Sequence, residues 1–432
     1  GKETKLFMDK NSTQTQPLKK ILTLSDHPLS PSGVGIQTRN FIKALLDTGR
    51  YEIISLGAAL KHAKYNMQVV EEYKGLWRIL PTNNFGTQEQ IRYVLHNEKP
   101  DLLWFMTDPR YFYWLWEMEH EIRPNVPMMY YHVWDNKPAP LYNKPYYDST
   151  DKIITISKLT NEVVREIAPD VECQYHPHAV DPDIFKPLDK ELLDQFSAEN
   201  TFLDPNKFTI FWNNRNGRRK HPATLIEWFA AFLDKVGHDK AQLLMHTNPV
   251  DSQGTNLHAI VAKLGLTKEQ IIFSSKHLNE QVLNIFYNLA DVTVNISDAE
   301  GFGLGTLESL SAGTPIIVNM TGGLQEQVTD GENYFGVGIQ PSSQMLIGSL
   351  PTPYVYEDRI NKNDFLDALE KLMNMTQEER NALGLAGQQH VYKNYNYESY
   401  KTKWVEIVDE FIERKGSWKN RKDHVHWSIK EF

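Results

Sequence analysis

Short apolar runs alternate with helical patterns along most of this 432-residue chain, in two successive series. Strands that alternate with helices form parallel sheets with crossover helices, and a chain of this length is too long for one ordinary core. We therefore predict an α/β protein with two domains, each a doubly wound parallel sheet. The predicted strands are ILTL (21–24), EIISL (52–56), LLWF (102–105), MMYY (128–131) and KIITI (152–156), then FTIFW (208–212), QLLMH (242–246), IIF (271–273), VTVNI (292–296) and PIIV (315–318).

A segment rich in proline and turn-forming residues, 176–207, separates the two series and is expected to be the interdomain linker. Near the carboxyl end, apolar residues recur at helical spacing and predict a helix over about 397–414 that packs on another element. The predicted divisions are a flexible tail (1–19), a first domain (20–187), a second domain (188–395), a C-terminal helix (396–416) and a polar tail (417–432).

Charge and cysteine content limit the classes of partner and compartment. The formal net charge of -9 gives no general reason to expect nucleic acid or an anionic membrane, and we find no clear nucleic-acid signal. No run of about 18 apolar residues predicts a transmembrane segment, although peripheral membrane contact stays open. The single cysteine, Cys173, fits a reducing compartment, so we expect a cytoplasmic protein, soluble or peripherally associated with a membrane.

A glycine-containing loop, SDHPLSPSGVG (25–35), follows the first predicted strand and leads into a helix expected over 36–46. Gly33 and Gly35 would let a ligand approach the backbone, and the helix N-terminus would favour an anion. A loop that needs glycine only for its turns is the alternative on this stretch alone.

A basic loop, NNRNGRRKHP, follows the strand FTIFW and carries four cations, Arg215, Arg218, Arg219 and Lys220. Open α/β sheets bind ligands at the carboxyl ends of their strands. One guanidinium fork and one ammonium group can together hold a diphosphate. The alternative is a solvated charged face.

Two glutamates flank the glycine turn in SDAEGFGLG and the helix after it. Glu308 lies four residues after Leu304, beside the apolar face, where an ionised carboxylate needs hydrogen bonds. The two hydroxyls of a ribose would supply them. Glu300 and the amides of 301–303 would then face the group beyond the phosphates. Alternatively, Glu308 pairs internally and Glu300 is a solvated loop acid.

These residues carry a resemblance. EGFGLGTLE (300–308), followed by SLSAGTPIIV, resembles the E-x7-E signature of retaining GT-B glycosyltransferases and is most similar to glycosyltransferase family 4. Arg215 and Lys220 match the arginine and lysine that hold the donor diphosphate in that family. HAVDPDIFKP (178–187) resembles the family's interdomain phrase, with Ala179 where glycine is common.

The resemblance covers most of residues 20–415, including the first glycine loop. It implies a GT-B fold, in which two Rossmann-like domains face a central cleft. The C-terminal helix would cross back onto the first domain. The implied catalytic residues are His132, Glu300, Arg215 and Lys220. The implied donor-binding residues are Gly33, Gly35, Arg215, Lys220, Glu300, Gly301, Phe302, Gly303, Leu304 and Glu308.

The implied reaction is transfer of a hexose-type sugar, with retention of configuration, from a UDP- or GDP-sugar to an acceptor. We expect no cofactor and no metal, since fixed cations would stabilise the leaving diphosphate and the predicted loops show no compact Asp-x-Asp or His/Cys cluster. Because Glu300 is expected to hold sugar hydroxyls, we favour front-face substitution over a covalent intermediate. His132 would bind the transferred sugar; without the resemblance, a lone histidine at a strand end is more often structural. Asp135 could equally cap a turn.

The acceptor is not readable from the sequence: a glycan, lipid-linked glycan, protein or small molecule are all compatible. A nucleotide-sugar-binding protein without turnover is one alternative. An NAD-dependent oxidoreductase is another, but its G-x-G-x-x-G spacing fails at Thr306 and at Thr38. The aromatic stretch 110–123 is expected to be a helix in the first domain's core or along the acceptor cleft. Its three glutamates weaken membrane or base-stacking roles.

Overall fold

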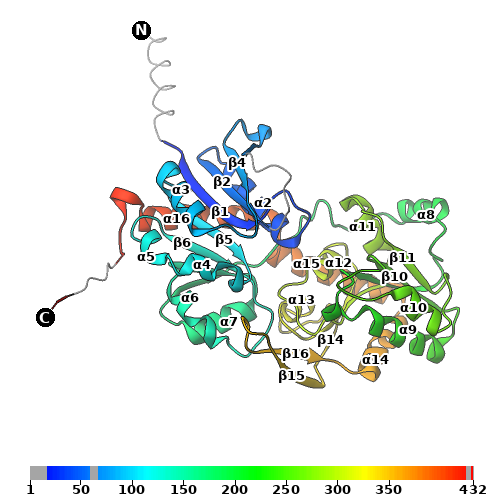
Figure 1. Cartoon of the computed structure of the whole chain (residues 1–432). Helices are drawn as coiled ribbons and strands as arrows, with labels where there is room; N and C mark the ends of the chain where they lie inside the picture. The colour runs from blue at the N-terminus through cyan, green and yellow to red at the C-terminus, as the bar shows by residue number, and fades with distance from the viewer. Residues whose placement is uncertain (1–16, 59–66, 425–429, 432) are drawn as a thin grey trace, which may run out of the picture.

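The computed structural model describes residues 17–58, 67–424 and 430–431, and within them it contains two parallel sheets joined by a linker (Figure 1). Most of the tail predicted at 1–19 and part of the tail predicted at 417–432 lie outside the described residues. The prediction of two doubly wound α/β domains is confirmed.

The first sheet has eight strands within the described part of the chain, in the order β3-β4-β2-β1-β5-β6-β7-β8. All neighbours pair in parallel except β3 with β4. The order changes direction between β1 and β5, which is the kind of point where open sheets bind ligands. The strands are β1 (Lys19–Asp26), β2 (Tyr51–Ala58), β3 (Gln68–Val69), β4 (Trp77–Pro81), β5 (Leu102–Thr107), β6 (Met128–His132), β7 (Lys152–Thr155) and β8 (Glu172–Tyr175).

The helices between these strands cover both faces of the sheet (Figure 1). They are α2 (Gly33–Leu46), α3 (Gln88–Glu98), α4 (Tyr113–Trp116), α5 (Glu119–Ile122), α6 (Lys144–Asp148) and α7 (Lys158–Ile167). Helix α2 begins three residues before the predicted start because the Ser32 hydroxyl caps it, accepting a hydrogen bond from the Gly35 amide at 3.0 Å.

The stretch 110–123 is not the single helix that we expected. A 3-10 turn (Pro109–Phe112), α4 and α5 divide it into short pieces. The break after Trp116 lets Met118 turn into the core, where Phe112, Trp116 and Met118 are buried. Tertiary packing of large side chains therefore overrides the local helical pattern.

The second sheet has six strands in the described residues, in the order β11-β10-β9-β12-β13-β14, all parallel. Its direction changes between β9 and β12. The strands are β9 (Phe208–Asn213), β10 (Ala241–His246), β11 (Ile271–Ser274), β12 (Val292–Asn295), β13 (Ile316–Asn319) and β14 (Gly336–Ile339). The surrounding helices are α9 (Pro222–Val236), α10 (Leu257–Lys263), α11 (Glu280–Leu289), α12 (Leu304–Ser311), α13 (Leu324–Val328), α14 (Lys362–Met373) and α15 (Gln377–Asn394).

A separate antiparallel hairpin follows β14. It consists of β15 (Ser343–Ile347) and β16 (Val355–Arg359). Its backbone carbonyls at Pro351 and Tyr354 accept hydrogen bonds from the hydroxyls of Tyr113 and Tyr142, at 2.9 and 2.8 Å. The hairpin therefore connects the second domain to the first.

Two segments cross between the domains on the opposite side. The linker contains α8 (Lys190–Glu199), and helix α16 (Tyr397–Lys415) returns to pack on α2 of the first domain (Figure 1). Trp404 of α16 is fully buried against the rings of Phe41 and Trp104. Beyond α16, the Trp418 indole donates to the Pro100 carbonyl at 2.9 Å, so this part of the predicted polar tail also contacts the first domain.

Trp404→Ala is expected to destabilise the protein by about 3–5 kcal/mol, because it leaves a cavity between α16 and the first sheet. Tyr392→Ala, which removes a ring that is 61% exposed on α15, is the matched control and should change stability by less than about 0.5 kcal/mol. Denaturant unfolding followed by circular dichroism measures both. Equal effects of the two substitutions would contradict this account of how α16 is anchored.

Candidate active site

Two loops at the carboxyl ends of neighbouring strands hold the predicted acidic and basic residues. Strands β9 and β12 pair directly, and the loop after β9 carries Arg215 and Lys220 while the loop after β12 carries Glu300. Gly303 adopts a φ of 91° at the N-terminus of α12, and a Cβ there would lie 2.7 Å from Leu324 Cδ2. Glycine is therefore required for the turn that delivers Glu300 to the β9 loop.

The Glu300 carboxylate is buried among cations. Its Oε2 forms a close ion pair with Lys220 Nζ and accepts a hydrogen bond from Asn295 Nδ2 at 3.3 Å, and its Oε1 lies 4.0 Å from Arg219 Nη2. Burial alone would raise the pKa of Glu300, but the adjacent Lys220 and Arg219 charges outweigh it and hold the pKa at about 2. Glu300 is therefore a fixed, ionised hydrogen-bond acceptor.

The side chains of the two residues predicted to bind the diphosphate, Arg215 and Lys220, point in different directions. Lys220 turns inward to Glu300, whereas the Arg215 side chain is 66% exposed and its Nε lies 3.4 Å from Asp251 Oδ2. The backbone between them is held by Asn216, whose buried amide donates to the Asn248 carbonyl at 3.1 Å and the Thr255 carbonyl at 2.8 Å. A bound anion between Arg215 and Lys220 would lie over this anchored turn.

Arg219, which sequence reasoning did not select, occupies a central position. Its Nη1 donates to the Ala299 carbonyl at 2.7 Å and lies 3.5 Å from Asp135 Oδ2 of the first domain. It thus contacts the Glu300 loop and the first domain together. Three adjacent cations in the sequence were the available signal, but their spacing could not show which one faces the cleft.

The first domain meets the Glu300 loop through the residues just after β6. A Cβ on Gly301 would lie 3.2 Å from both Asp135 Oδ1 and Val133 Cγ1. At Gly322, where φ is 52°, a Cβ would lie 1.8 Å from the Glu300 carbonyl oxygen and 2.8 Å from the Asp135 carbonyl oxygen. Only glycines permit this close approach of the two domains.

His132 lies in the interior of the first domain. It is fully buried at the end of β6, its Nε2 hydrogen-bonds the Tyr147 hydroxyl, and its ring stacks on Tyr130. Burial lowers the pKa of His132 to about 3, so the ring is neutral. Asp135, three residues later, reaches the Glu300 loop of the second domain through Arg219.

Glu308 has the opposite electrostatic environment to Glu300. It is partly buried on α12 and accepts one hydrogen bond, from the Tyr287 hydroxyl at 3.2 Å, which itself accepts from Asn213 Nδ2 at 2.9 Å. Burial raises the pKa of Glu308 to about 8, against the lowering effect of the Tyr287 hydrogen bond. The side chain is therefore mostly protonated at neutral pH.

The remaining predicted donor-binding residues divide between the domains. Gly33 starts α2 with open space around its Cα, whereas a Cβ on Gly35 would lie 2.3 Å from Ser30 Oγ, so Gly35 serves close packing of its own loop. Phe302 is buried against the rings of His178 and Tyr395, and Leu304 is the first residue of α12. Their backbones line the turn next to Glu300.

Comparison with known proteins agrees with this geometry. Residues 194–390 match the family described as glycosyl transferases group 1. This match lies in the second domain and covers less than half of the chain. A D-inositol 3-phosphate glycosyltransferase 2 from Catenulispora acidiphila is 28% identical over 159 residues, which are 36% of this chain and 36% of that protein. A D-inositol 3-phosphate glycosyltransferase from Acidothermus cellulolyticus is 36% identical over 95 residues, 21% of each chain. The chain therefore covers only 36% and 21% of the length of these two curated relatives.

Solved structures extend the likeness to both domains. Sucrose-phosphate synthase from Thermosynechococcus elongatus superposes with a TM-score of 0.71 at 15% identity, covering 91% of this chain and 99% of that one. HepE from Anabaena, in complex with UDP and glucose, gives 0.65 at 13% identity over 91% and 100% of the two chains. The GT-B fold is thereby confirmed.

Two properties of the described residues concern membranes and metal ions. No helix there is long and apolar enough to cross a membrane. No group of three or more His, Cys, Asp or Glu side chains there could hold a metal ion.

Lys220→Met is expected to lower the free energy of unfolding at pH 7 by roughly 1–3 kcal/mol. The pKa of Glu300 is depressed from 4.5 to about 2, so its ion pair stabilises the fold above pH 4.5 and loses this effect as the pH falls toward 2. The difference from wild type should therefore shrink between pH 4.5 and pH 3, as measured by denaturant unfolding. Arg218→Met, at an exposed cation of the same loop, is the control. A difference for Lys220→Met that stays constant down to pH 3 would contradict the assignment.

Proposed function

We propose that this protein is a retaining glycosyltransferase that moves a hexose-type sugar from a nucleoside-diphosphate sugar to an acceptor. The observation that carries the proposal is the buried Glu300 carboxylate held by Lys220 and Arg219 at the switch point of the second sheet. Ligands bind at such points in open α/β sheets. The family match of residues 194–390 supports the same reading.

The donor would span the two loops of the second domain. Arg215 and Lys220 would hold the diphosphate, since a guanidinium fork and an ammonium group both suit phosphate oxygens. Glu308 would accept hydrogen bonds from the ribose hydroxyls, and Glu300 from the hydroxyls of the transferred sugar. UDP is the first nucleotide to test because the solved HepE structure contains UDP and glucose; GDP is the second.

The reaction depends on departure of the diphosphate. When the bond from sugar C1 to the phosphate oxygen breaks, its electron pair stays on the phosphate, and the cations of the β9 loop would stabilise that charge. In front-face substitution, the acceptor hydroxyl attacks C1 from the side that the phosphate leaves. Its proton passes to the departing phosphate oxygen. No protein nucleophile is needed, and Glu300 stays paired with Lys220 throughout.

Asp135 and Arg219 would position the two domains for this step. Their 3.5 Å contact joins the first domain to the Glu300 loop, and a closed cleft excludes water that would otherwise hydrolyse the donor. His132, three residues before Asp135, would hold the end of β6 in place through its hydrogen bond with Tyr147. A direct contact between His132 and the sugar would require its ring to leave the buried position.

The direct test is binding and turnover with a panel of UDP- and GDP-sugars in the presence of EDTA. We expect UDP or GDP to bind, and Arg215→Ala to weaken binding at least tenfold, about 1.4 kcal/mol. Arg218→Ala removes the same charge from an exposed position in the same loop and should change affinity less than twofold. Absence of nucleoside-diphosphate binding and release, or equal loss in both variants, would refute the proposal. A change in nicotinamide absorbance instead would point to an oxidoreductase.

Nucleoside-diphosphate binding is also expected to release protons through Glu308. The free protein holds this carboxyl protonated near neutral pH because its pKa is about 8, and hydroxyls that donate to it favour the ionised form. Titration calorimetry at pH 7, in two buffers of different ionisation enthalpy, should therefore detect release of up to about one proton per nucleotide bound. Glu308→Gln should abolish this release and retain binding. Unchanged release in Glu308→Gln would remove the ribose role.

A further inference from the structure

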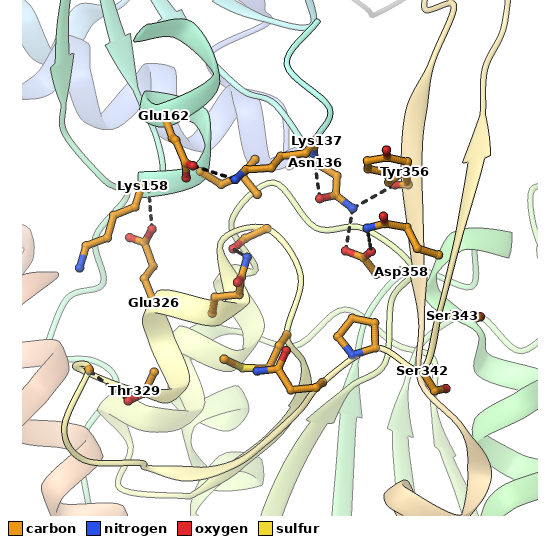
Figure 2. Close-up of a pocket in the computed structure, with 18 of the residues that line it drawn as sticks. Asn136, Lys137, Lys158, Glu162, Glu326, Thr329, Ser342, Ser343, Tyr356 and Asp358 are labelled. Carbon is orange, nitrogen blue, oxygen red and sulfur yellow. Dashed lines mark hydrogen bonds and ion pairs between the residues drawn. The ribbon is translucent and has the colours of Figure 1, made fainter. Parts of the chain in front are cut away.

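A cavity lies between the two domains, beside the Glu300 loop. Its volume is about 840 Å³, within the range of about 300–1,000 Å³ typical of small-molecule sites. One wall comes from the first domain, at Asn136–Lys137 and the start of α7, and the other from α13, the 329–331 loop and the hairpin of β15 and β16 (Figure 2). Lining residues follow the carboxyl ends of four strands, β6, β7, β13 and β14.

Gly322 lies at the boundary between the cavity and the Glu300 loop. Gly322 lines the cavity, and the same residue packs between the carbonyl oxygens of Glu300 and Asp135. Since β13 is the direct neighbour of β12, the cavity continues the ligand-binding edge of the second sheet. A molecule in it would lie next to the sugar that Glu300 is proposed to hold.

The walls are held across the domain boundary by hydrogen bonds. Asn136 Nδ2 donates to the Tyr356 carbonyl at 3.0 Å and to Asp358 Oδ2 at 2.7 Å, and the Tyr356 amide donates to the Lys137 carbonyl at 2.8 Å (Figure 2). Gln344 Nε2 also donates to Asp358, at 2.7 Å. These hydrogen bonds therefore fix the hairpin against the first domain, where it forms one wall of the cavity.

Most charges in the lining already have protein partners. Lys137 Nζ lies 2.7 Å from Glu162 Oε1, and Glu326 accepts from the Lys158 main-chain amide at 2.7 Å, a contact that does not involve the Lys158 ammonium group (Figure 2). Asp358 accepts from Asn136, Gln344 and Thr321. The uncharged amides and hydroxyls of the lining are at Gln325, Thr329, Gln340, Ser342 and Ser343. Those of Gln325, Thr329 and Ser342 each donate one hydrogen bond within the protein and keep acceptor capacity for a ligand.

The excess of carboxylates over ammonium groups in the lining disfavours an anionic ligand. The lining contains two ammonium groups, Lys137 and Lys158, against four carboxylates, Glu162, Glu326, Asp330 and Asp358. A phosphate or carboxylate ligand would enter an excess of negative charge. Amides and hydroxyls, which both donate and accept, suit a ligand whose own groups are hydroxyls.

We propose that this cavity binds part of a neutral, polyhydroxylated acceptor, the chemistry of an uncharged glycan, next to the proposed donor site. The inference rests on the proposed glycosyltransferase function and adds the acceptor class and the surface that selects it. The part of the acceptor in the cavity would flank the hydroxyl that attacks the donor sugar. The hairpin of β15 and β16 would then determine acceptor specificity.

Two substitutions that fill the cavity test the proposal, Gln340→Trp and Ser343→Trp. Both positions are exposed and line the cavity, so a larger side chain should be compatible with folding. Leu350→Trp places the same side chain on the same hairpin at a residue that is 99% exposed and outside the lining. Thermal unfolding identifies folded variants, and the use of two fillers keeps the test decisive if one variant does not fold.

The neutral probes are three trisaccharides, maltotriose, cellotriose and chitotriose. The anionic probes are glucose 6-phosphate and inositol 3-phosphate. Binding is measured by saturation-transfer NMR and calorimetry in saturating UDP or GDP. We expect wild type to bind at least one trisaccharide and neither anion. The filling variants should lose at least tenfold in trisaccharide affinity, whereas Leu350→Trp should stay within twofold. All variants should bind the nucleoside diphosphate as wild type does.

Failure of the inference differs from failure of the proposed function. Nucleotide binding without trisaccharide binding, stronger binding of the anions, or trisaccharide binding unaffected by Gln340→Trp and Ser343→Trp would each overturn the acceptor site and leave the donor site standing. Loss of nucleoside-diphosphate binding in the wild-type protein would instead refute the glycosyltransferase proposal.

Discussion

The contact between the buried Glu300 carboxylate and the cations of the β9 loop is the constraint on which the rest of the site depends. An ionised carboxylate removed from water costs several kcal/mol unless it is paired and hydrogen-bonded. Lys220, Arg219 and Asn295 satisfy it, and in doing so they hold two loops of neighbouring strands against each other. Arg219 also reaches Asp135, so the same charge cluster sets the position of the first domain at the mouth of the cleft.

Two glutamates on one turn and helix acquire opposite protonation states because only one of them has cations nearby. Glu300 has a pKa of about 2 and Glu308 a pKa of about 8. The chemistry that each can perform follows from this difference: an anion already paired with Lys220 accepts hydroxyl protons in hydrogen bonds without attacking carbon, and a protonated carboxyl on α12 can lose its proton when hydroxyls bind. A ligand is therefore needed to ionise Glu308, whereas Glu300 is ionised by the protein itself.

The sequence predicted the parts of this structure that depend on local pattern. Each of the ten apolar runs became a strand, and the turn around Gly303 could be found because only glycine fits a φ of 91° against Leu324. Strand β8, whose residues are only partly buried, has no apolar run to reveal it. Other features depend on how the two domains meet, which no pattern along one segment encodes. They are the position of Arg219 between Asp135 and Glu300, and the packing of the hairpin on the first domain. The break at Trp116 likewise results from core packing.

The contacts between the domains differ in strength between the cleft side and the side where α16 packs on the first domain. On the cleft side, the domains are joined by the exposed Asp135–Arg219 pair, worth about 0–1 kcal/mol. Several hydrogen bonds, worth about 1 kcal/mol each, also join the first domain to the hairpin and to α13, at Tyr113, Asn136, Lys137, Leu141, Tyr142 and Lys158. On the other side, Trp404 is fully buried in the first domain, and the backbones of Val180 and Tyr395 are hydrogen-bonded at 3.0 Å where the two crossing segments meet. Burial of a tryptophan is worth several of the cleft contacts combined. A motion that separates the domains while Trp404 stays buried would therefore have to break the Asp135–Arg219 pair together with the hydrogen bonds to the hairpin and α13, and its reversal would rebuild the Glu300 site and the hairpin-walled cavity together.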